Sequence, residues 1–291
     1  MILMLILLFL LRGANVVCVQ LAQRGRVSTI PQSVVFVTIY SALQAIVFLL
    51  IPPYSLSIPD LKFLIYPFFF AMLYSVGNVL LLKTLRLGSA AVANTIGQFN
   101  MLVPVAFGMI YWGESLGVFQ IIGLVLFIIG LLIYNGSSVS VGEEKQKISV
   151  KFLIYAVVSM LFTGSAVIFT KLGMAAYPEF GKQYLFYYAF FAMIIGAIIS
   201  LKTAPGEIKP LVRDKKLLLN CALAAISVDI TNVIFVSYIN AFPTAIFMPS
   251  YSVIGMLGIM LASRVVLKEK ISKSAMISSL VCIIAILCLN L

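Results

Sequence analysis

The stretch LRLGSAAVANTIGQFNMLVPVAFGMIYWGE, residues 85–114, decides the fold because a partial copy of it recurs later in the chain. The copy spans residues 240–269 and reads NAFPTAIFMPSYSVIGMLGIMLASRVVLKE. A constant offset of 155 residues aligns the two without a gap and places Glu114 opposite Glu269. Each stretch begins at a short polar corner, continues through a long apolar run and ends on one glutamate. The two stretches therefore form a candidate internal repeat.

The composition indicates a membrane protein. The 291 residues are 63% hydrophobic and 10% charged, with a mean hydropathy of +1.15. Soluble domains carry roughly a quarter charged residues and roughly half apolar ones. Apolar runs of about 20 residues, long enough to cross a hydrocarbon core of about 30 Å, recur along the chain. The sequence therefore predicts a polytopic helical protein, without the alternation typical of a β-barrel.

Ten transmembrane helices fit these apolar runs. The longest polar stretch, residues 136–149, is predicted to be a linker between a first five-helix repeat, residues 1–135, and a second, residues 150–291. The predicted helices cover residues 2–22, 31–51, 61–83, 89–112, 116–135, 150–171, 182–201, 217–240, 243–264 and 272–290.

The first and sixth predicted helices extend the repeat. An offset of 151 residues places Gly13 opposite Gly164 and Gln20 opposite Lys171. Because each half has an odd number of helices, the second half must enter the membrane in the opposite sense. The predicted fold class is therefore an all-α membrane protein of ten transmembrane helices, arranged as two inverted five-helix repeats. Many secondary transporters are built in this way, with the substrate site near the midplane between the halves.

The loop charges predict an orientation. Most of the net charge of +11 lies in loops that follow the odd-numbered predicted helices. The positive-inside rule places these loops in the cytoplasm and both termini outside. The rule explains the basic charge without a nucleic-acid partner, and we expect a multi-pass protein of the cell (inner or plasma) membrane. The N-terminal MILMLILLFLL lacks a basic region and a cleavage site, so it is interpreted as the first span.

A family resemblance rests on Leu85–Ala90 with Gly113 and Glu114, on the Lys268–Glu269 pair, and on the first helix around Gly13. In these features the chain resembles the EamA-type, ten-helix branch of the drug/metabolite transporter superfamily. The resemblance covers essentially the whole chain and implies transport of a metabolite, amino acid, amine or drug-like molecule. Two departures stand out. Arg12 replaces the tryptophan that such proteins often place before the first-helix glycine, and the second glutamate follows lysine instead of glycine.

Two charged residues, Arg12 and Asp229, lie well inside predicted spans. An arginine at that depth costs about 2.5–3.5 kcal/mol on insertion scales. Arg12 is therefore predicted either to bind an anionic or carboxylate group, or to form a structural ion pair or snorkel. Asp229 is predicted to bind a substrate amine or to take up a proton coupled to transport. The alternative is a salt bridge between Asp229 and Arg12, which would neutralise both charges.

Polar residues on the third and eighth predicted helices point to the same cavity. The offset of 155 places Asp229 at the position of Tyr74, and Asn232 and Asn78 each follow about one turn later. These four side chains are predicted to face one central cavity.

Further polar positions complete the predicted lining. Asn94 and Gln98 form a stripe on the fourth helix, which either lines the cavity or makes interhelical hydrogen bonds. Asn100 points elsewhere and is assigned to packing. The full predicted set is Arg12, Asn15, Tyr74, Asn78, Asn94, Gln98, Asp229, Asn232, Ser250 and Tyr251.

Other candidate residues are given structural roles. Glu114 and Glu269 are interpreted as structural turn residues that tether helix ends. Lys171, at the end of the sixth predicted helix, is expected to snorkel. The four cysteines are interpreted as small apolar side chains, and the chain has no histidine, so no metal site is predicted. No Walker A motif is present, and no cofactor and no catalytic residue are predicted.

These observations predict a secondary transporter and not an enzyme. It would import or export a small organic metabolite or drug-like solute, such as an amine or amino acid, by alternating access, with a proton as the default coupling ion. One alternative is a membrane-embedded enzyme acting on a lipid or isoprenoid, which would need more convergent catalytic groups. The other is a non-transporting membrane scaffold. The expected partners are the solute and the lipid bilayer, without nucleic acid, in a monomer or homodimer.

Overall fold

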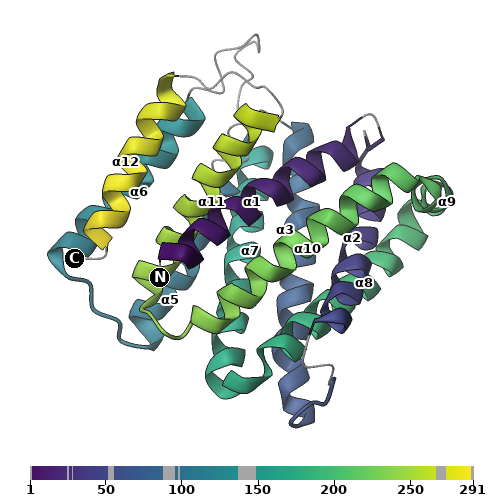
Figure 1. The fold of residues 1–291 in the computed structure, drawn as a ribbon, viewed down its shortest axis with the longest axis horizontal. Helices are drawn as coiled ribbons and strands as arrows, with labels where there is room; N and C mark the ends of the chain where they lie inside the picture. The colour runs from purple at the N-terminus through teal and green to yellow at the C-terminus, as the bar shows by residue number, and fades with distance from the viewer. Residues whose placement is uncertain are drawn as a thin grey trace.

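The computed structural model describes residues 2–24, 26–27, 29–51, 56–87, 96–97, 99–136, 149–266 and 273–289. Within these ranges the chain is helical and contains no strand (Figure 1). Seven of the described helices are long and apolar enough to cross a membrane, and three further apolar helices are shorter. The prediction of an all-helical, multi-pass membrane protein is therefore confirmed.

The described helices follow the predicted positions closely. Their bounds are α1 (Ile2–Gln23), α2 (Ile30–Leu50), η1 (Leu61–Leu64), α3 (Ile65–Leu87), η2 (Phe99–Met101), α5 (Leu102–Tyr111), α6 (Val118–Gly136), α7 (Val150–Ala176), η4 (Pro178–Phe180), α8 (Gly181–Thr203), α9 (Pro205–Arg213), α10 (Lys215–Tyr238), α11 (Thr244–Val266) and α12 (Lys273–Leu289). In the predicted helix 89–112, residues 89–95, with Asn94 among them, lie outside the described residues, as do Gln98 and Glu269.

Two differences from the predicted helices have clear causes. The predicted sixth helix stopped at residue 171, but α7 continues to Ala176. Its C-cap is Tyr177, which comes just before Pro178. The short helix α9 was missed because its nine residues are rich in charge and contain an internal proline, Pro210. It forms because Leu211 packs in a core cluster with residues of α2 and α10.

Local capping explains where two of the helices begin. Thr29 and Gln32 form a reciprocal capping box at the start of α2, where Pro31 is tolerated in the first turn. Asp214 caps α10 by accepting hydrogen bonds from the backbone N–H groups of Lys216 and Leu217. Arg26 Nε lies 2.6 Å from Asp214 Oδ2, which ties the end of α1 to the start of α10. These two helix ends therefore lie on one face of the molecule.

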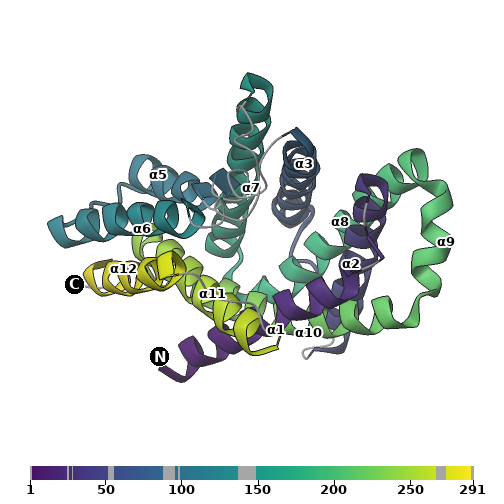
Figure 2. The ribbon, with the colours of Figure 1, turned by 90° about the horizontal axis from the view of Figure 1, so that it is seen from above.

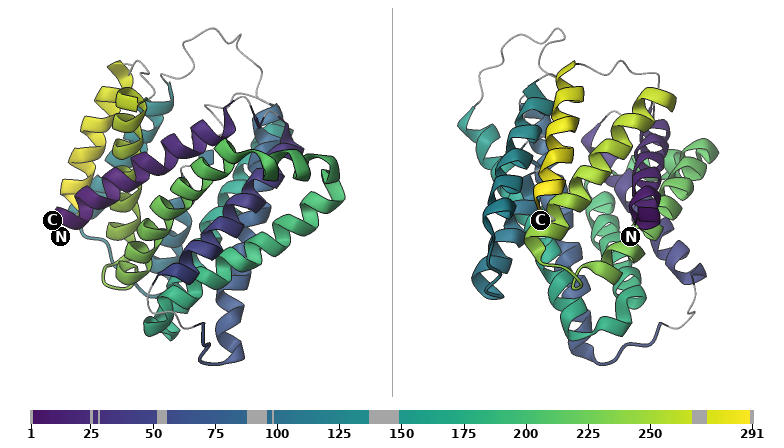
Figure 3. Two further views of the ribbon diagram at one scale, coloured as in Figure 1. Left: turned by 45° about the vertical axis from the view of Figure 1, so that its right-hand side comes forward. Right: turned by 60° about the vertical axis from the view of Figure 1, so that its left-hand side comes forward.

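The helices form a ring with one pair outside it. The principal packed pairs are α3 with α7, α6 with α12, α1 with α10, α2 with α8, and α1 with α11. Seen from above, α6 and α12 lie together at one side, away from α2, α8 and α9 (Figure 2). The N- and C-termini lie close to each other on the same side of the molecule (Figure 3).

Glycines at the two aligned positions allow close helix contacts. A Cβ added at Gly13 on α1 would lie 2.6 Å from the backbone oxygen of Gly258 on α11. A Cβ added at Gly164 on α7 would lie 2.6 Å from Val103 Cβ on α5. Small residues of this kind let membrane helices approach closely. Gly13 and Gly164, which the sequence predicts to correspond, therefore have the same packing role.

Candidate functional site

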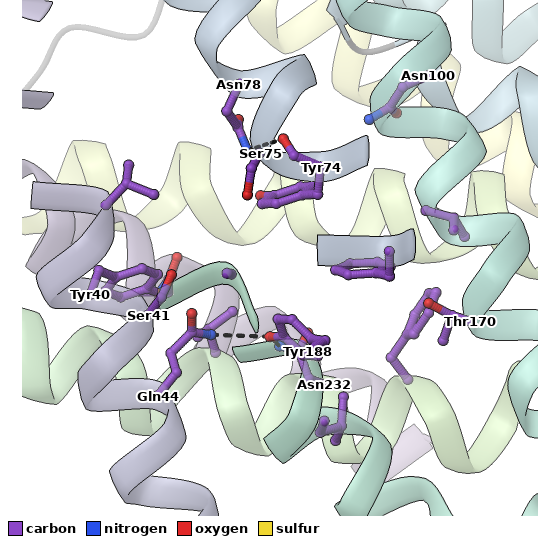
Figure 4. Close-up of a pocket in the computed structure, with 18 of the residues that line it drawn as sticks. Tyr40, Ser41, Gln44, Tyr74, Ser75, Asn78, Asn100, Thr170, Tyr188 and Asn232 are labelled. Atoms are coloured by element: carbon purple, nitrogen blue, oxygen red, sulfur yellow. Dashed lines mark hydrogen bonds between the residues drawn. The ribbon is translucent and has the colours of Figure 1, made fainter. Parts of the chain in front are cut away.

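A cavity of about 560 Å³ lies among the helices of the ring. Its described lining residues come from α1, α2, α3, α7, α8, α10 and α11 and from the segment η2–α5, whereas α6 and α12 contribute none of them. The lining residues labelled in Figure 4 all carry an amide, an aliphatic hydroxyl or a tyrosine ring. The cavity thus has a mixed polar and aromatic wall, which is suited to a small organic molecule.

The described lining is more exposed towards one end of the cavity, here called the open end, than towards the other, here called the closed end. Near the end of α1 and the start of α2, Gln23 and Val37 are partly exposed, although Val34 and Phe36 are buried. Lining residues at the opposite end are buried: Tyr184 is 1% exposed and Met248 is 4% exposed. The open end is the face that carries the Arg26–Asp214 ion pair.

Six of the predicted site residues line this cavity, namely Arg12, Asn15, Tyr74, Asn78, Asn232 and Tyr251. Ser250 does not, because Met248, Tyr251 and Ser252 occupy the cavity face of α11 and Ser250 lies off that face. The Ser250 hydroxyl is buried without a hydrogen-bond partner. Asn100 was assigned to packing, and this was wrong: it lines the cavity (Figure 4). It lies in η2, whose 3₁₀ geometry breaks the α-helical register assumed for the fourth helix.

Asp229 lies behind the cavity wall. The residue is 0% exposed and is not among the lining residues. Its Oδ1 atom accepts a hydrogen bond of 3.0 Å from Gln44 Nε2, while its Oδ2 atom is buried without a partner. Among the described residues, the ion pairs are Arg26 with Asp214 and Lys171 with Glu114, so the salt bridge between Asp229 and Arg12 does not form.

Gln44 and Tyr188 connect Asp229 to the cavity. Gln44 Nε2 also donates to the Tyr188 hydroxyl at 3.2 Å, and Asn232 Nδ2 donates to the same oxygen at 2.8 Å (Figure 4). Because this oxygen already accepts two hydrogen bonds, the hydroxyl hydrogen of Tyr188 is directed away from both donors. Sequence reasoning missed both Gln44 and Tyr188, although a lone amide inside the apolar run of α2 was a usable signal for Gln44.

Two asparagines on the wall have local partners. Asn15 Nδ2 donates to the Tyr40 hydroxyl at 2.8 Å and to the backbone oxygen of Ala224 at 2.9 Å. Asn78 Nδ2 donates to the backbone oxygen of Tyr74 at 2.9 Å. Asn15 therefore joins α1 to α2 and α10, whereas Asn78 satisfies a carbonyl of its own helix.

Arg12 faces the cavity with little compensation for its charge. Its guanidinium carbon lies 4.7 Å from the centroid of the Tyr251 ring. Its Nε atom is buried without a hydrogen-bond partner. Within the part of the chain that the structure describes, Arg12 makes no ion pair, so the predicted structural ion pair is not found there.

A polar cluster holds the closed end together. Lys171 Nζ lies 2.7 Å from Glu114 Oε1 and also contacts the Thr244 hydroxyl. The Thr244 backbone N–H donates to Glu114 Oε2 at 2.7 Å, and Lys171 Nζ lies 4.5 Å from the Trp112 ring centroid. We call Trp112, Glu114, Lys171 and Thr244 the closed-end cluster. Burial alone raises the pKa of Glu114, but the hydrogen bonds from Lys171 and Thr244 outweigh burial and hold the pKa below its usual value.

The closed-end cluster corrects one prediction and matches another. Lys171 does not snorkel; it is 8% exposed, because α7 continues past it and Glu114 lies within reach. Glu114 follows Gly113, whose positive φ of 63° turns the chain, and it links three segments of the protein as a structural tether.

Comparisons with known proteins match the first 136 residues of the chain to one family. Residues 1–136 match the EamA-like transporter family. The match confirms the resemblance to the drug/metabolite transporter superfamily that the sequence predicted. It ends at Gly136, where α6 also ends.

Two individual proteins are similar to this chain. An uncharacterized protein of Methanocaldococcus jannaschii is 31% identical over 84 residues, which are 29% of this chain and 61% of that protein. The chain therefore matches less than two thirds of that relative's length. A solved structure described as "Crystal structure of protein" has a TM-score of 0.69 and 14% sequence identity, over 99% of this chain and 98% of that one. At this identity the likeness shows a shared fold alone.

The name of the matched family bears on function. The model that residues 1–136 match describes a family of transporters. Among the described lining residues of the cavity, Arg12 is the charged side chain.

Proposed function

We propose that this EamA-like protein is a secondary transporter that moves a small organic solute by alternating access. The observation that carries the proposal is the central cavity, which is lined from both halves of the chain and whose lining is more exposed at one end than at the other. Alternating access requires such a site together with a second state in which the opposite end is open. The structure corresponds to one of these two states in our proposal.

We propose that the two halves are inverted five-helix repeats, residues 1–135 and 150–291, joined by the linker 136–149. The packing of helices supports this division. The proposed symmetry exchanges α1 with α7, α2 with α8, α3 with α10, α5 with α11 and α6 with α12. Under this exchange the pair α1–α10 becomes α7–α3, and the pair α1–α11 becomes α7–α5. The two helices of each of these four pairs pack against each other. The same holds for α3–α8 and α10–α2, which also exchange with one another. Such a pattern is what a pseudo-two-fold axis in the membrane plane would produce.

The closed-end cluster is proposed to hold one gate shut. Glu114 belongs to the first half, whereas Lys171 and Thr244 belong to the second, so opening this end must separate Lys171 from Glu114. We propose that the protein lies in a cell membrane with its open end facing the cytoplasm and both termini outside. This orientation follows from the positive-inside rule, because the basic loops lie on the side of the open end.

Asp229 is proposed as the site of proton coupling. It is a fully buried carboxylate with one oxygen unpartnered, and Gln44 and Tyr188 link it to the cavity. A change in its charge would alter the hydrogen bonds that Gln44 and Tyr188 make, and so would reach a bound solute. Asp229 is too deeply placed to contact the solute itself, and we propose that it acts as a positioning and proton-storing residue.

The test is uptake into proteoliposomes that contain the purified protein, with and without an imposed pH gradient. Amino acids, amines and carboxylates would be offered as labelled solutes. We expect Asp229→Asn to abolish the pH dependence of uptake while the protein stays folded. Glu179→Gln is the matched control, because Glu179 is exposed and its change removes a carboxylate that does not line the cavity. Unchanged uptake kinetics and pH dependence in Asp229→Asn would refute the coupling role, and no uptake of any solute would refute transport.

A further inference from the structure

Arg12 is the charged residue of the described cavity wall, and this limits what the cavity can bind. The other described lining residues are neutral amides, hydroxyls, aromatic rings or aliphatic side chains. Asp229, which the sequence offers as a compensating negative charge, accepts a hydrogen bond from Gln44 and lies outside the lining. A cation inside a membrane protein costs several kcal/mol unless it is paired. The wall therefore presents one positive charge that the described part of the protein does not neutralise.

The contact between Arg12 and Tyr251 leaves the donors of the guanidinium available. An arginine that stacks on a ring uses the face of its planar group, while its five N–H donors lie around the edge. Here the guanidinium carbon lies 4.7 Å from the Tyr251 ring centroid, and no described residue accepts a hydrogen bond from Arg12. The Nε side of the group is buried, so the terminal N–H groups are the part of Arg12 that is left for a ligand in the cavity.

Gly255 lies beside the buried Nε side of the guanidinium. It lies one turn after Tyr251 on α11, and a Cβ added there would lie 3.4 Å from Arg12 Nε. The absence of a side chain lets α11 lie close to this side of Arg12, so a ligand would meet the terminal N–H groups. A carboxylate matches the fork of N–H donors in a bidentate arrangement.

The rest of the wall indicates the body of the ligand. One cation compensates one negative charge, so a monoanion fits better than a phosphate dianion. Aromatic rings from several helices surround the same space, and they suit an apolar or aromatic body. They are Tyr40, Phe70, Tyr74, Tyr188 and Phe235. A ligand amine, by contrast, meets no carboxylate on the described wall.

We propose that Arg12 and Tyr251 form a carboxylate subsite, and that the solute is a monocarboxylate with an apolar body. This inference rests on the proposed transport function and narrows its substrate class. It selects carboxylates over the simple amines that Asp229 alone would favour.

Binding to the purified full-length protein tests the subsite. The probes are 3-phenylpropionate, its neutral amide 3-phenylpropanamide, and phenethylamine, which share one aromatic body and differ in the charged group. Butyrate and indole-3-acetate extend the carboxylate panel. We expect at least one carboxylate to bind at least tenfold more tightly than its amide, measured by calorimetry, and phenethylamine to bind most weakly.

Variants assign the effect to Arg12. Arg12→Gln should weaken carboxylate binding at least tenfold and leave amide binding unchanged, and Arg12→Lys should fall between. Lys202→Gln is the matched control, since it also removes one positive charge but lies exposed near the end of α8. The subsite is overturned if no carboxylate binds more tightly than its amide, or if Arg12→Gln binds carboxylates as the unaltered protein does.

Counterflow in proteoliposomes separates this inference from the proposed function. Carboxylate binding that depends on Arg12, without movement across the membrane, would refute transport and leave the subsite standing. Movement of a solute that is unaffected by Arg12→Gln would refute the subsite and leave transport standing.

Discussion

The helices α1 and α7 are the first helices of the two halves, and an offset of 151 residues aligns Gly13 with Gly164. Both glycines lie in close contact with a helix of the other half, Gly13 with α11 and Gly164 with α5. The charges of the two helices differ. Arg12 on α1 faces the cavity and has no ion-pair partner among the described residues, whereas Lys171 on α7 lies near the closed end and pairs with Glu114.

The residues at the corresponding positions are neutral and behave differently. Thr163, opposite Arg12 in the alignment, is buried and donates a hydrogen bond of 2.9 Å to the backbone oxygen of Ser159. Gln20, opposite Lys171, is exposed. The comparison shows that α1 and α7, which pack in a similar way, each place a cation in a different role. Its depth along the helix decides whether it faces the cavity or joins the two halves.

Among the predicted substitutions, the removal of the Lys171 side-chain charge should have the largest effect on stability. Lys171→Met leaves the largely buried Glu114 carboxylate without its cation, and breaking such a pair costs about 3–5 kcal/mol. We expect a large drop in the unfolding temperature in detergent, with Lys202→Met as a control that has little effect. The double variant Lys171→Met with Glu114→Gln should recover part of the loss. An unfolding temperature equal to that of the unaltered protein would show that the closed-end cluster contributes no stability.

The shared glycine contacts should give the next largest effect. Gly13→Ala and Gly164→Ala each place a Cβ against backbone or Cβ atoms of a neighbouring helix, and overpacking of this kind costs about 1–3 kcal/mol. Gly206→Ala is the control, because a Cβ at that position meets nothing within 4 Å. Unfolding in detergent measures all three. If only one of the two central glycines proves sensitive, the packing of α1 and α7 is less alike than their alignment indicates.

A pH series should show how much stability the Lys171–Glu114 pair contributes. Its effect should be smaller than the effects of the lysine and glycine substitutions. The pKa of Glu114 lies below its usual value, so its contribution to stability is fully present above the unfolded pKa of about 4.3. That contribution is lost as the pH falls through the lower, folded pKa. The difference in unfolding temperature between the unaltered protein and Glu114→Gln should therefore shrink on acidification. A difference that grows would mean that the carboxylate destabilises the folded state.

Thr163→Val should have the smallest effect. The substitution removes one hydrogen bond to a backbone oxygen of the same helix and preserves the shape of the side chain. Interhelical hydrogen bonds in membranes contribute about 0.6 kcal/mol on average, and a bond within one helix should contribute no more. Solute binding should be unaltered, in contrast to Arg12→Gln. A large loss of binding would show that α7 takes part in the site at this depth.

The sequence predicted the positions of helices well because apolar periodicity and polar breaks are local properties. The offset of 151 also predicted the correspondence of Gly13 with Gly164. The residues Arg12 and Tyr251 were both named, but their contact depends on how α1 packs on α11, which no local pattern contains. Asp229 was predicted to face the cavity, yet Gln44 from α2 lies between them. Asn100 was misassigned because a 3₁₀ turn changes the register within an apolar segment.

The pair α6–α12 lies outside the ring and has its own close contacts: a Cβ added at Gly123 would lie 2.9 Å from the Ala285 backbone oxygen, and Ser278 donates to the Gly130 oxygen at 2.6 Å. Its outer residues, such as Phe119 and Leu280, are exposed and apolar, as expected of a surface in contact with lipid acyl chains. Because neither helix lines the described cavity, a fluorophore or spin label attached to their outer surfaces would leave the wall chemically intact. Paired with a second label on α2 or α8, it would give a spectroscopic ruler for the motion between the two states.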